Sequence, residues 1–299
     1  MLEILKAVIF GIVEGITEWL PVSSTGHLIL LDELLKLKQG DAFFEMFEVV
    51  IQLGAILAVV VIYFHKLNPF SSRKTQKQKM MTIQLWVKVL IGCLPAGIVG
   101  LLFNDTIDKY LYHWYVVAAM LIIYGVLFIV VENRQKGVEP KVTKISQLTL
   151  PMLLMIGVFQ MLSMIPGTSR SGATIVGALL TGVSRSVAAE FTFFLAIPAM
   201  FGASGLKLIN FGFHYTPMQV AILLVGVVVS FFVSIVAIEF LMKYIKKHDF
   251  KVFAYYRIVL GIIVLLYFGI TGDLLQPQDV TSRHRGAKPP RRYELLEKE

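Results

Sequence analysis

Two carboxylates that are four residues apart, Glu14 and Glu18, lie in the first apolar segment of the chain. On a helix this spacing places both side chains on one face, about one turn apart. The ordinary explanation is the charged face of a solvated surface helix, but apolar residues surround this pair on nearly all sides. Paired carboxylates in a low-dielectric cavity can hold a divalent cation, Mg²⁺ or Ca²⁺, or divide the roles of acid and base. We therefore interpret Glu14 and Glu18 as candidate catalytic residues and candidate metal ligands.

A short polar segment, PVSSTGH, follows these carboxylates and begins at Pro21. Capping a helix N-terminus needs one hydroxyl, so Ser23, Ser24 and Thr25 together exceed what a cap requires. His27 alone would be explained equally well as a buried, hydrogen-bonded histidine. Beside Ser24 and two glutamates, it becomes a candidate nucleophile or acid/base partner. We predict that Ser24 and His27 are catalytic, and that Ser23 and Thr25 contact a substrate phosphate.

A second polar segment, PGTSRSGAT, begins at Pro166. Its glycines permit close backbone approach, and hydroxyls and amides at a helix N-terminus bind anionic oxygens. Arg170 adds a guanidinium that can fork onto a phosphate. It could instead neutralise a buried glutamate, although an arginine that does so can also clamp a phosphate. Arg170 is therefore a further candidate catalytic residue, and the predicted phosphate-binding set of this segment is Gly167, Thr168, Ser169, Arg170, Ser171 and Thr174.

The two polar segments belong to two stretches that look like diverged copies of one sequence. The stretches align without gaps from Gly11 and Gly157, and each reads as an apolar helix that meets a proline, breaks and resumes. Broken backbone at membrane depth persists only where it lines a protein cavity, so a repeated pair of broken helices indicates a binding site near the membrane midplane. The alignment pairs Glu14 with Gln160, Ser23 with Ser169, Ser24 with Arg170, Thr25 with Ser171 and Gly26 with Gly172.

Composition indicates an integral membrane protein. Of the 299 residues, 56% are hydrophobic and 16% are charged, whereas soluble domains are about 25% charged. The net charge of +8 arises from basic residues that gather in loops between apolar segments. Membrane topology explains this distribution of charge, which therefore argues against a nucleic-acid partner. The sequence has a single cysteine, Cys93, so an intrachain disulfide is excluded. Cys93 is best explained as a small buried residue.

Six apolar windows are long enough to cross a bilayer, which takes about 20 residues. Two further apolar stretches, residues 2–37 and 147–182, are the broken copies. We expect each of them to form a re-entrant helix–loop–helix hairpin that enters and leaves on one side. The predicted fold class is therefore an all-α polytopic membrane protein with six transmembrane helices and two re-entrant hairpins. The six predicted spans are residues 43–64, 83–103, 114–131, 187–206, 218–242 and 252–270.

The loops between the predicted spans differ in basic charge, and Lys and Arg favour the cytoplasmic side of a membrane. Basic and base-poor loops alternate along the chain. With six spans, all basic loops are then cytoplasmic, the first hairpin enters the membrane from outside, and the second enters from inside. Such an arrangement is an inverted-topology repeat. The basic loops cover residues 66–79, 134–144 and 243–251, and the base-poor loops cover 104–113 and 207–217.

A single membrane-embedded catalytic domain, residues 1–272, accounts for this organisation, with repeat halves of about 1–131 and 147–270. The tail, residues 276–299, is polar and has no apolar periodicity, so we expect it to be disordered or added by cloning. Both termini come out extracytoplasmic, and the bases of the tail conflict with that position. Because the tail resembles no part of the domain, it does not alter the predicted topology.

Other polar residues in the predicted spans are less informative. Glu48, Gln52 and Glu190 could line the same cavity, or they could form hydrogen bonds between helices. The sequence contains no zinc-protease, Walker, Rossmann or serine-hydrolase motif. The candidate chemistry therefore depends on the two polar segments.

Both polar segments resemble signatures of the undecaprenyl-pyrophosphate phosphatases of the bacitracin-resistance type. EGITEWLPVSSTGH is similar to the glutamate-rich N-terminal signature of that family, and PGTSRSGAT is similar to its second signature. The resemblance extends over residues 2–270 and includes the stretches IQLGAILAV and EFTFFLAIPA. The two signatures together are highly specific, and no motif position departs from them.

The resemblance implies removal of the terminal phosphate from undecaprenyl pyrophosphate, which regenerates the monophosphate carrier for peptidoglycan synthesis and confers resistance to bacitracin. It also implies an enzyme of the bacterial inner membrane that needs a divalent cation and has its active site on the extracytoplasmic side. The partners would be the C55 prenyl pyrophosphate lipid and the bilayer, and a homodimer is left open.

The candidate residues suit such a reaction. Arg170 would hold the phosphates, and Glu14 and Glu18 would hold Mg²⁺ or Ca²⁺ or position a water. Ser24, His27 or that water would attack phosphorus, and the sequence leaves these three alternatives open. Inverted repeats with broken helices also occur in secondary transporters, so a lipid flippase is the alternative function and an anion channel is a third.

Overall fold

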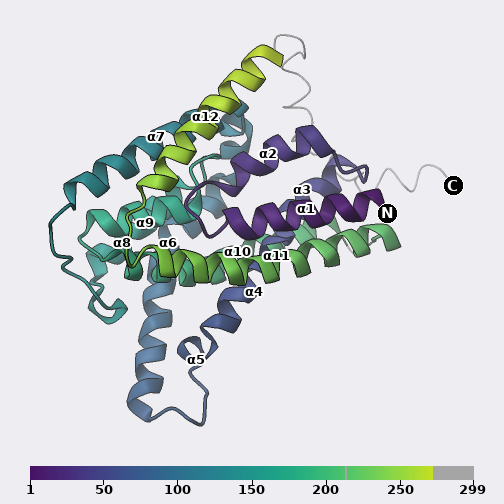
Figure 1. The fold of residues 1–299 in the computed structure, drawn as a ribbon. Coiled ribbons are helices and arrows are strands. Elements are labelled where there is room, and N and C mark those ends of the chain that lie inside the picture. The colour runs from purple at the N-terminus through teal and green to yellow at the C-terminus, as the bar shows by residue number, and fades with distance from the viewer. Residues whose placement is uncertain (213, 272–299) are drawn as a thin grey trace.

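The computed structural model describes residues 1–212 and 214–271, and the predicted tail lies outside this part of the chain. The described residues form twelve α-helices and one short 3₁₀ helix, with no β-strand among them (Figure 1). The all-α prediction is therefore confirmed. The helices are α1 (Leu2–Thr17), α2 (Ser24–Leu35), α3 (Asp41–Val50), α4 (Gln52–Ile62), α5 (Phe64–Leu67), α6 (Gln76–Leu111), α7 (Trp114–Arg134), η1 (Ile145–Gln147), α8 (Leu150–Leu162), α9 (Arg170–Leu180), α10 (Arg185–Phe211), α11 (Pro217–Tyr244) and α12 (Lys251–Thr271).

Six segments of the described chain are long and apolar enough to cross a membrane, and each overlaps one predicted span. One of them, Ala42–Ile62, combines α3 and α4. The sequence prediction of a loop at residues 104–113 is largely wrong, because α6 continues to Leu111. No glycine or proline lies between Leu101 and Leu111 to stop this helix.

The two polar segments separate pairs of short helices, as the sequence predicted. α1 and α2 flank residues 18–23, and α8 and α9 flank residues 163–169. These four helices contain 16, 12, 13 and 11 residues. At about 1.5 Å per residue their lengths are about 16–24 Å, less than the roughly 30 Å of a bilayer core. Each helix of these pairs is thus too short to cross a membrane alone.

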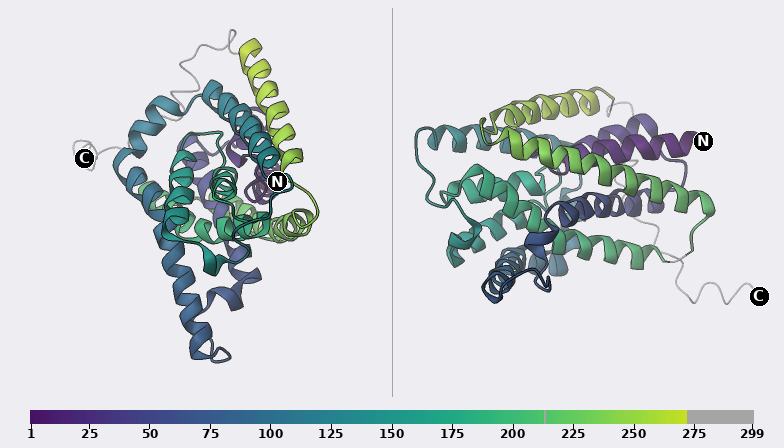
Figure 2. Two further views of the ribbon diagram at one scale, coloured as in Figure 1. Left: turned by 90° about the vertical axis from the view of Figure 1, so that its left-hand side faces the viewer. Right: turned by 60° about the horizontal axis from the view of Figure 1, so that its bottom comes forward.

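Helix packing joins segments that are far apart in the sequence. α1 packs along α11, α8 packs along α6, and α7 packs along α12 (Figures 1 and 2). Glycines permit the first two contacts. A Cβ atom at Gly11 would lie 2.8 Å from the carbonyl oxygen of Gly226, and one at Gly157 would lie 2.7 Å from that of Gly92. Small residues at these positions let the helix backbones approach closely, as is common in membrane bundles.

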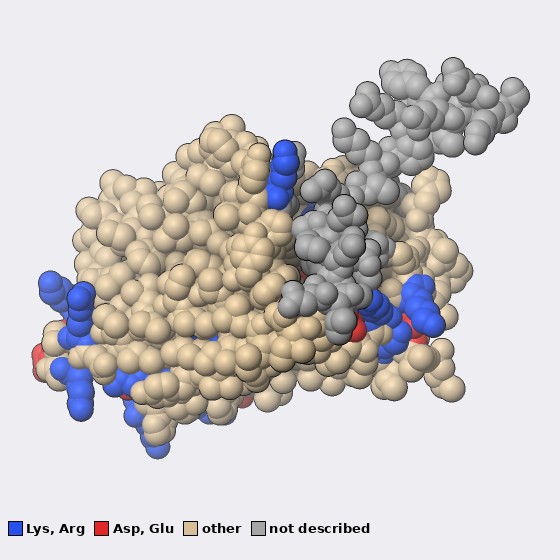
Figure 3. Space-filling model, turned by 90° about the horizontal axis from the view of Figure 1, so that it is seen from above, with Lys and Arg blue, Asp and Glu red and all other residues tan. Residues whose placement is uncertain are grey.

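The interior is centred on α10, which contacts α3, α4, α6 and α9. Phe191, Phe193 and Phe194 of this helix are almost completely buried, and the ring of Trp19 packs edge-on against Phe193 with centroids 5.2 Å apart. On the outside, a broad area is largely uncharged, and Lys and Arg gather toward the margins of the view (Figure 3). An apolar exterior of this kind suits contact with lipid.

Candidate active site

The break after α1 meets the break before α9 through one carboxylate. Arg170 donates from Nη2 to Oε1 of Glu18 over 2.8 Å, and the hydroxyl of Ser24 donates to Oε2 of the same carboxylate over 2.9 Å. The side chains of Glu18 and Arg170 are only 6% and 12% exposed. The structure therefore brings these three predicted residues together. We call Glu18, Ser24 and Arg170 the central cluster.

The two turns that present this cluster have the same unusual backbone conformation. Ser23 has φ 74° and Ser169 has φ 70°, and these residues occupy equivalent positions in the aligned copies. Each serine caps the following helix, because its Oγ accepts from the amide of Gly26 over 3.3 Å or of Gly172 over 3.2 Å. A non-glycine residue at positive φ costs about 1–3 kcal/mol, and such strain gathers at functional sites. The shared strain therefore marks both turns as parts of a site.

Hydroxyl groups of the second segment tie it to its surroundings. Ser171 donates to the carbonyl oxygen of Glu18 over 3.0 Å, and the hydroxyls of Thr174 and Thr192 lie 2.8 Å apart. Arg170 donates from Nη1 to the carbonyl oxygen of Thr192 over 3.0 Å. These bonds fix the guanidinium between the first turn and α10. In this arrangement Ser171 and Thr174 bond to protein groups, and their predicted contact with phosphate stays a prediction.

Several buried polar atoms beside the central cluster have no hydrogen-bond partner among the described residues. Both carboxylate oxygens of Glu14 are in this state, and the Glu14 side chain is completely buried. The others are Oε1 of Gln160, Oγ1 of Thr168 and Nε of Arg170. A polar group buried without a partner is costly, so these atoms indicate a place where a ligand or ion completes the bonding.

The donors present fit a hard divalent cation only in part. Glu14 and Glu18 are one helical turn apart and can offer carboxylate oxygens, which Mg²⁺ and Ca²⁺ prefer. Within the described residues, no group of three or more His, Cys, Asp or Glu side chains is arranged to hold a metal ion. Two carboxylates with water or phosphate oxygens suit Mg²⁺, which usually keeps several waters and binds together with substrate phosphates. Glu48 of α3 also interacts electrostatically with Glu14.

His27 bonds to groups other than Ser24 in the described structure, and its predicted catalytic role stays a prediction. Its Nδ1 lies 2.6 Å from the carbonyl oxygen of Ser23, and its Nε2 lies 2.7 Å from the hydroxyl of Tyr256. A carbonyl oxygen can only accept, so Nδ1 carries a proton, and in the neutral ring the Tyr256 hydroxyl donates to Nε2. The carboxylate of Glu18, not His27, is therefore the group that accepts a hydrogen bond from Ser24.

The remaining predicted residues differ in their burial and in the groups that they contact. Gly167 has φ 87° and packs on α7, where a Cβ atom would lie 2.4 Å from the carbonyl oxygen of Val117. Thr168 is completely buried and Thr25 is half-buried. Glu190 does not join the site, because its carboxylate pairs with Lys66 over 2.7 Å.

Two residues of α12 were missed by reasoning from the sequence. Tyr256 bonds to His27, as described above, and the two rings stack with centroids 5.6 Å apart. Arg257 is completely buried and donates to backbone carbonyl oxygens of both turns. An arginine within the apolar window 252–270 was a signal that could have identified this position, because intramembrane charges are rare and usually functional.

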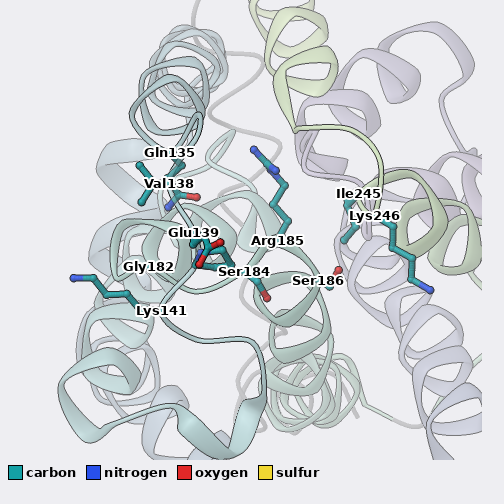
Figure 4. Close-up of a pocket in the computed structure, with 11 residues that line it drawn as sticks. Gln135, Val138, Glu139, Lys141, Gly182, Ser184, Arg185, Ser186, Ile245 and Lys246 are labelled. Atoms are coloured by element: carbon teal, nitrogen blue, oxygen red, sulfur yellow. The ribbon is translucent and has the colours of Figure 1, made fainter.

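Two cavities lie away from these turns, among the basic loops. One has a volume of about 310 Å³ and lies beside Gln135, Lys141 and Arg185 (Figure 4). The other has a volume of about 620 Å³ and is lined by side chains that include Lys74 and Lys88. Arg185 binds Glu132, and Lys74 and Lys88 donate to backbone carbonyl oxygens. Neither cavity includes a residue of the central cluster.

Comparison with known proteins gives a consistent set of relatives. A family model described as "Bacitracin resistance protein BacA" matches residues 7–263. The chain is 61% identical over 269 residues to a protein of Desulfitobacterium hafniense named undecaprenyl-diphosphatase, covering 90% of this chain and 97% of the relative. It is 60% identical to undecaprenyl-diphosphatase 1 of Clostridioides difficile over 90% of this chain and 97% of the relative. It is 59% identical to the undecaprenyl-diphosphatase of Lactiplantibacillus plantarum over 90% of this chain and 98% of the relative.

Proposed function

The chain belongs to the bacitracin resistance protein BacA family, and from this premise we propose how its central cluster works. The protein is a multi-pass membrane phosphatase that hydrolyses undecaprenyl diphosphate to undecaprenyl phosphate and inorganic phosphate. We place the reaction at Glu18, Ser24 and Arg170. The observation that carries this assignment is the carboxylate of Glu18, which binds an arginine on one oxygen and a serine hydroxyl on the other.

Arg170 is the group that holds the diphosphate. Its Nε is buried and has no partner among the described residues, whereas Nη1 and Nη2 are held by Thr192 and Glu18. A guanidinium fixed in this way presents its remaining N–H groups without rearrangement. Preorganised donors of this kind stabilise the charge that develops on phosphate oxygens during transfer.

Ser24 is the proposed nucleophile, and Glu18 is its general base. The hydroxyl proton passes to Glu18 Oε2 as Ser24 Oγ forms a bond to the terminal phosphorus. The bond from that phosphorus to the bridging oxygen then breaks, and undecaprenyl phosphate leaves with the electron pair. Water hydrolyses the phosphoserine to release inorganic phosphate and regenerate the hydroxyl. Activation of a serine by an adjacent base is the general requirement for such covalent catalysis.

We further propose that Glu14 and Glu18 hold a divalent cation together with substrate oxygens. Such a cation would neutralise charge on the diphosphate when bound. The unpartnered oxygens of Glu14 support this assignment. Both Mg²⁺ and Ca²⁺ satisfy the donor chemistry, and Mg²⁺ better suits a site with only two carboxylates.

The proposed membrane arrangement is an inverted repeat of two re-entrant hairpins. Three observations support it: the four hairpin helices are too short to span a bilayer, the turns share one backbone conformation, and the packing is symmetric. The symmetry is that α1 packs on α11 whereas α8 packs on α6, so each hairpin packs on a helix of the opposite half. With the basic loops in the cytoplasm, we propose that the active site faces the extracytoplasmic side, as the family resemblance implies.

The assignment is tested with the purified protein in detergent and undecaprenyl diphosphate as substrate. Arg170→Ala should lower phosphate release by about a thousandfold or more, and Arg170→Lys should recover little, because a point charge lacks the planar fork that phosphate oxygens accept. Removing one partner of a buried ion pair can cost about 3–5 kcal/mol of stability, so elution profile and thermal midpoint must show that each variant is folded. A folded Arg170→Ala protein with near wild-type phosphate release would exclude the assignment. Lipid movement between leaflets without phosphate release from the wild type would instead favour a flippase.

A further inference from the structure

Arg257 lies on α12, and its guanidinium contacts the carbonyl oxygens of three other segments. Nη1 donates to Pro21 in the first turn over 3.3 Å. Nη2 donates to Gly167 over 3.0 Å and to Thr168 over 2.8 Å, both in the second turn. Longer contacts reach Met120 at 3.4 Å and Leu121 at 3.5 Å on α7. One side chain therefore bonds to both broken turns and to the helix behind them.

The two turns are bound at equivalent places. When Gly11 is aligned with Gly157, Pro21 falls on Gly167. Arg257 thus bonds to the backbone carbonyl group at the equivalent position of each copy of the repeat. A planar guanidinium has five N–H donors in a fixed fork and can reach two loops at once, which a single ammonium group does poorly.

The position is a costly one for a charge. Arg257 is 0% exposed, and among the described residues no carboxylate forms an ion pair with it. Carbonyl dipoles and the ring of Tyr124, 5.6 Å from the guanidinium carbon, compensate the charge. A buried cation without an anionic partner is expensive, so a retained one points to a specific geometric task.

Gly172 makes room for this group. A Cβ atom at Gly172 would lie 2.8 Å from Nη1 of Arg257. Gly172 is also the residue whose amide is capped by Ser169, at the start of the helix that carries Arg170. A displacement of the guanidinium would therefore change the conformation of the strained turn that orients Arg170.

We propose that Arg257 is a positioning residue that holds the two broken turns in register, so that Glu18, Ser24 and Arg170 meet. The proposal rests on the assignment of the reaction to these three residues. Arg257 touches none of their side chains and acts only through the backbone. The C-terminal helix α12 is thereby an integral part of the active site, although none of the signature residues lies on it.

The test is a double-mutant cycle on kcat with undecaprenyl diphosphate in detergent. Arg257→Lys should lower kcat about ten- to a hundredfold with less than about a threefold change in KM, because apolar contacts of the lipid tail are unaffected. In the Ser24→Ala background, the same change should cost less than it does in the wild type, since one of the three groups that it positions is gone. Equal losses in both backgrounds would show a merely structural role and overturn the proposal.

The matched control is Arg185→Lys. Arg185 is another arginine in an ion pair, and its partner Glu132 lies outside the site. This substitution should lower the thermal midpoint and leave kcat within about twofold. If Arg257→Lys does not fold, Gly172→Ala displaces the guanidinium with the charge retained and should also lower kcat. Wild-type kcat in folded Gly172→Ala protein would contradict the proposal. If Ser24→Ala alone is silent, the nucleophile assignment fails, and the comparison of Arg257→Lys with Arg185→Lys still decides the positioning role.

Discussion

At the scale of single residues, the site is organised around the two oxygens of Glu18. One oxygen bonds to the guanidinium of Arg170 and the other to the hydroxyl of Ser24. The guanidinium and the carboxylate form a buried ion pair, and the second carboxylate oxygen accepts the serine hydroxyl. The guanidinium and the serine hydroxyl are therefore coupled through one carboxylate.

Ser24→Ala distinguishes attack by the serine from attack by water. Loss of a nucleophile removes the covalent route, so we expect phosphate release to fall by more than about a thousandfold. A hydroxyl that only binds would cost about ten- to a hundredfold, or about 1.4–2.7 kcal/mol of barrier. Ser184→Ala is the control, because Ser184 caps α10 away from the site and its loss should reduce stability only. A loss of less than about a hundredfold in folded Ser24→Ala protein would favour water.

Tyr256→Phe tests whether the orientation of His27 matters. The change removes the hydroxyl from Nε2 but leaves the stacked ring and the bond from Nδ1 to Ser23. Loss of one neutral hydrogen bond is worth about 0.5–1.5 kcal/mol, so we expect kcat to fall by up to about tenfold. The double variant with His27→Ala should be no slower than His27→Ala alone. Steady-state kinetics that show multiplied losses would mean that Tyr256 acts independently of His27.

At the scale of elements, close helix packing holds the hairpins in place. Gly11 of α1 faces the backbone of α11, and Gly157 of α8 faces the backbone of α6. Both contacts leave no room for a Cβ atom, so the two helix pairs can approach only because these positions are glycine. The helices that carry Glu14 and Gln160 are thereby fixed against neighbours from the other half of the chain.

Gly157→Ala should lower the thermal midpoint of the purified protein by several degrees, because its Cβ atom would lie 2.7 Å from the carbonyl oxygen of Gly92. Gly202→Ala is the matched control on α10, where an added Cβ atom meets nothing within 4 Å. That change should be neutral or slightly stabilising, because alanine favours helix by about 0.5–1 kcal/mol over glycine. Equal midpoints for the two variants would contradict close packing at Gly157.

At the scale of the whole molecule, the protein is a membrane enzyme whose described residues are all-α and whose central cluster joins two distant parts of the sequence. The turn after α1 contributes Glu18, α2 contributes Ser24 and α9 contributes Arg170, and Arg257 of α12 bonds to the backbone of both turns. Because its lipid substrate has a long apolar tail, a site formed by turns inside the bundle lets the head group react while the tail stays in the bilayer.

Accessibility of introduced cysteines tests the proposed orientation. In a Cys93→Ala background, cysteines in the 73–79 and 243–247 loops should be shielded from an impermeant thiol reagent in intact cells. A cysteine at position 108 should react, because that end of α6 is assigned to the outside. Permeabilised cells give the control, since all three positions should then be labelled. The opposite pattern in intact cells would reverse the side of the active site.

Sequence alone determined the class of the fold and the two segments that carry chemistry, because hydrophobic length and helix-breaking residues are local properties of the chain. It determined the family as well, through the signatures around Glu18 and Arg170. It did not determine which partner each polar group takes. That His27 bonds to Tyr256 instead of Ser24, and that Glu190 bonds to Lys66, depends on distances between helices that no local pattern encodes.

The role of Arg257 was decided only by the tertiary structure. A charged residue in an apolar window indicates function, but the sequence does not reveal its partners. Arg257 bonds to the backbone carbonyl groups of Pro21, Gly167 and Thr168, and every residue of a protein has such a group. Carbonyl groups have no sequence signature, so their arrangement becomes visible only when the two turns and α12 are brought together. These contacts matter because Arg257 is buried, and a buried arginine must find its hydrogen-bond acceptors within the protein.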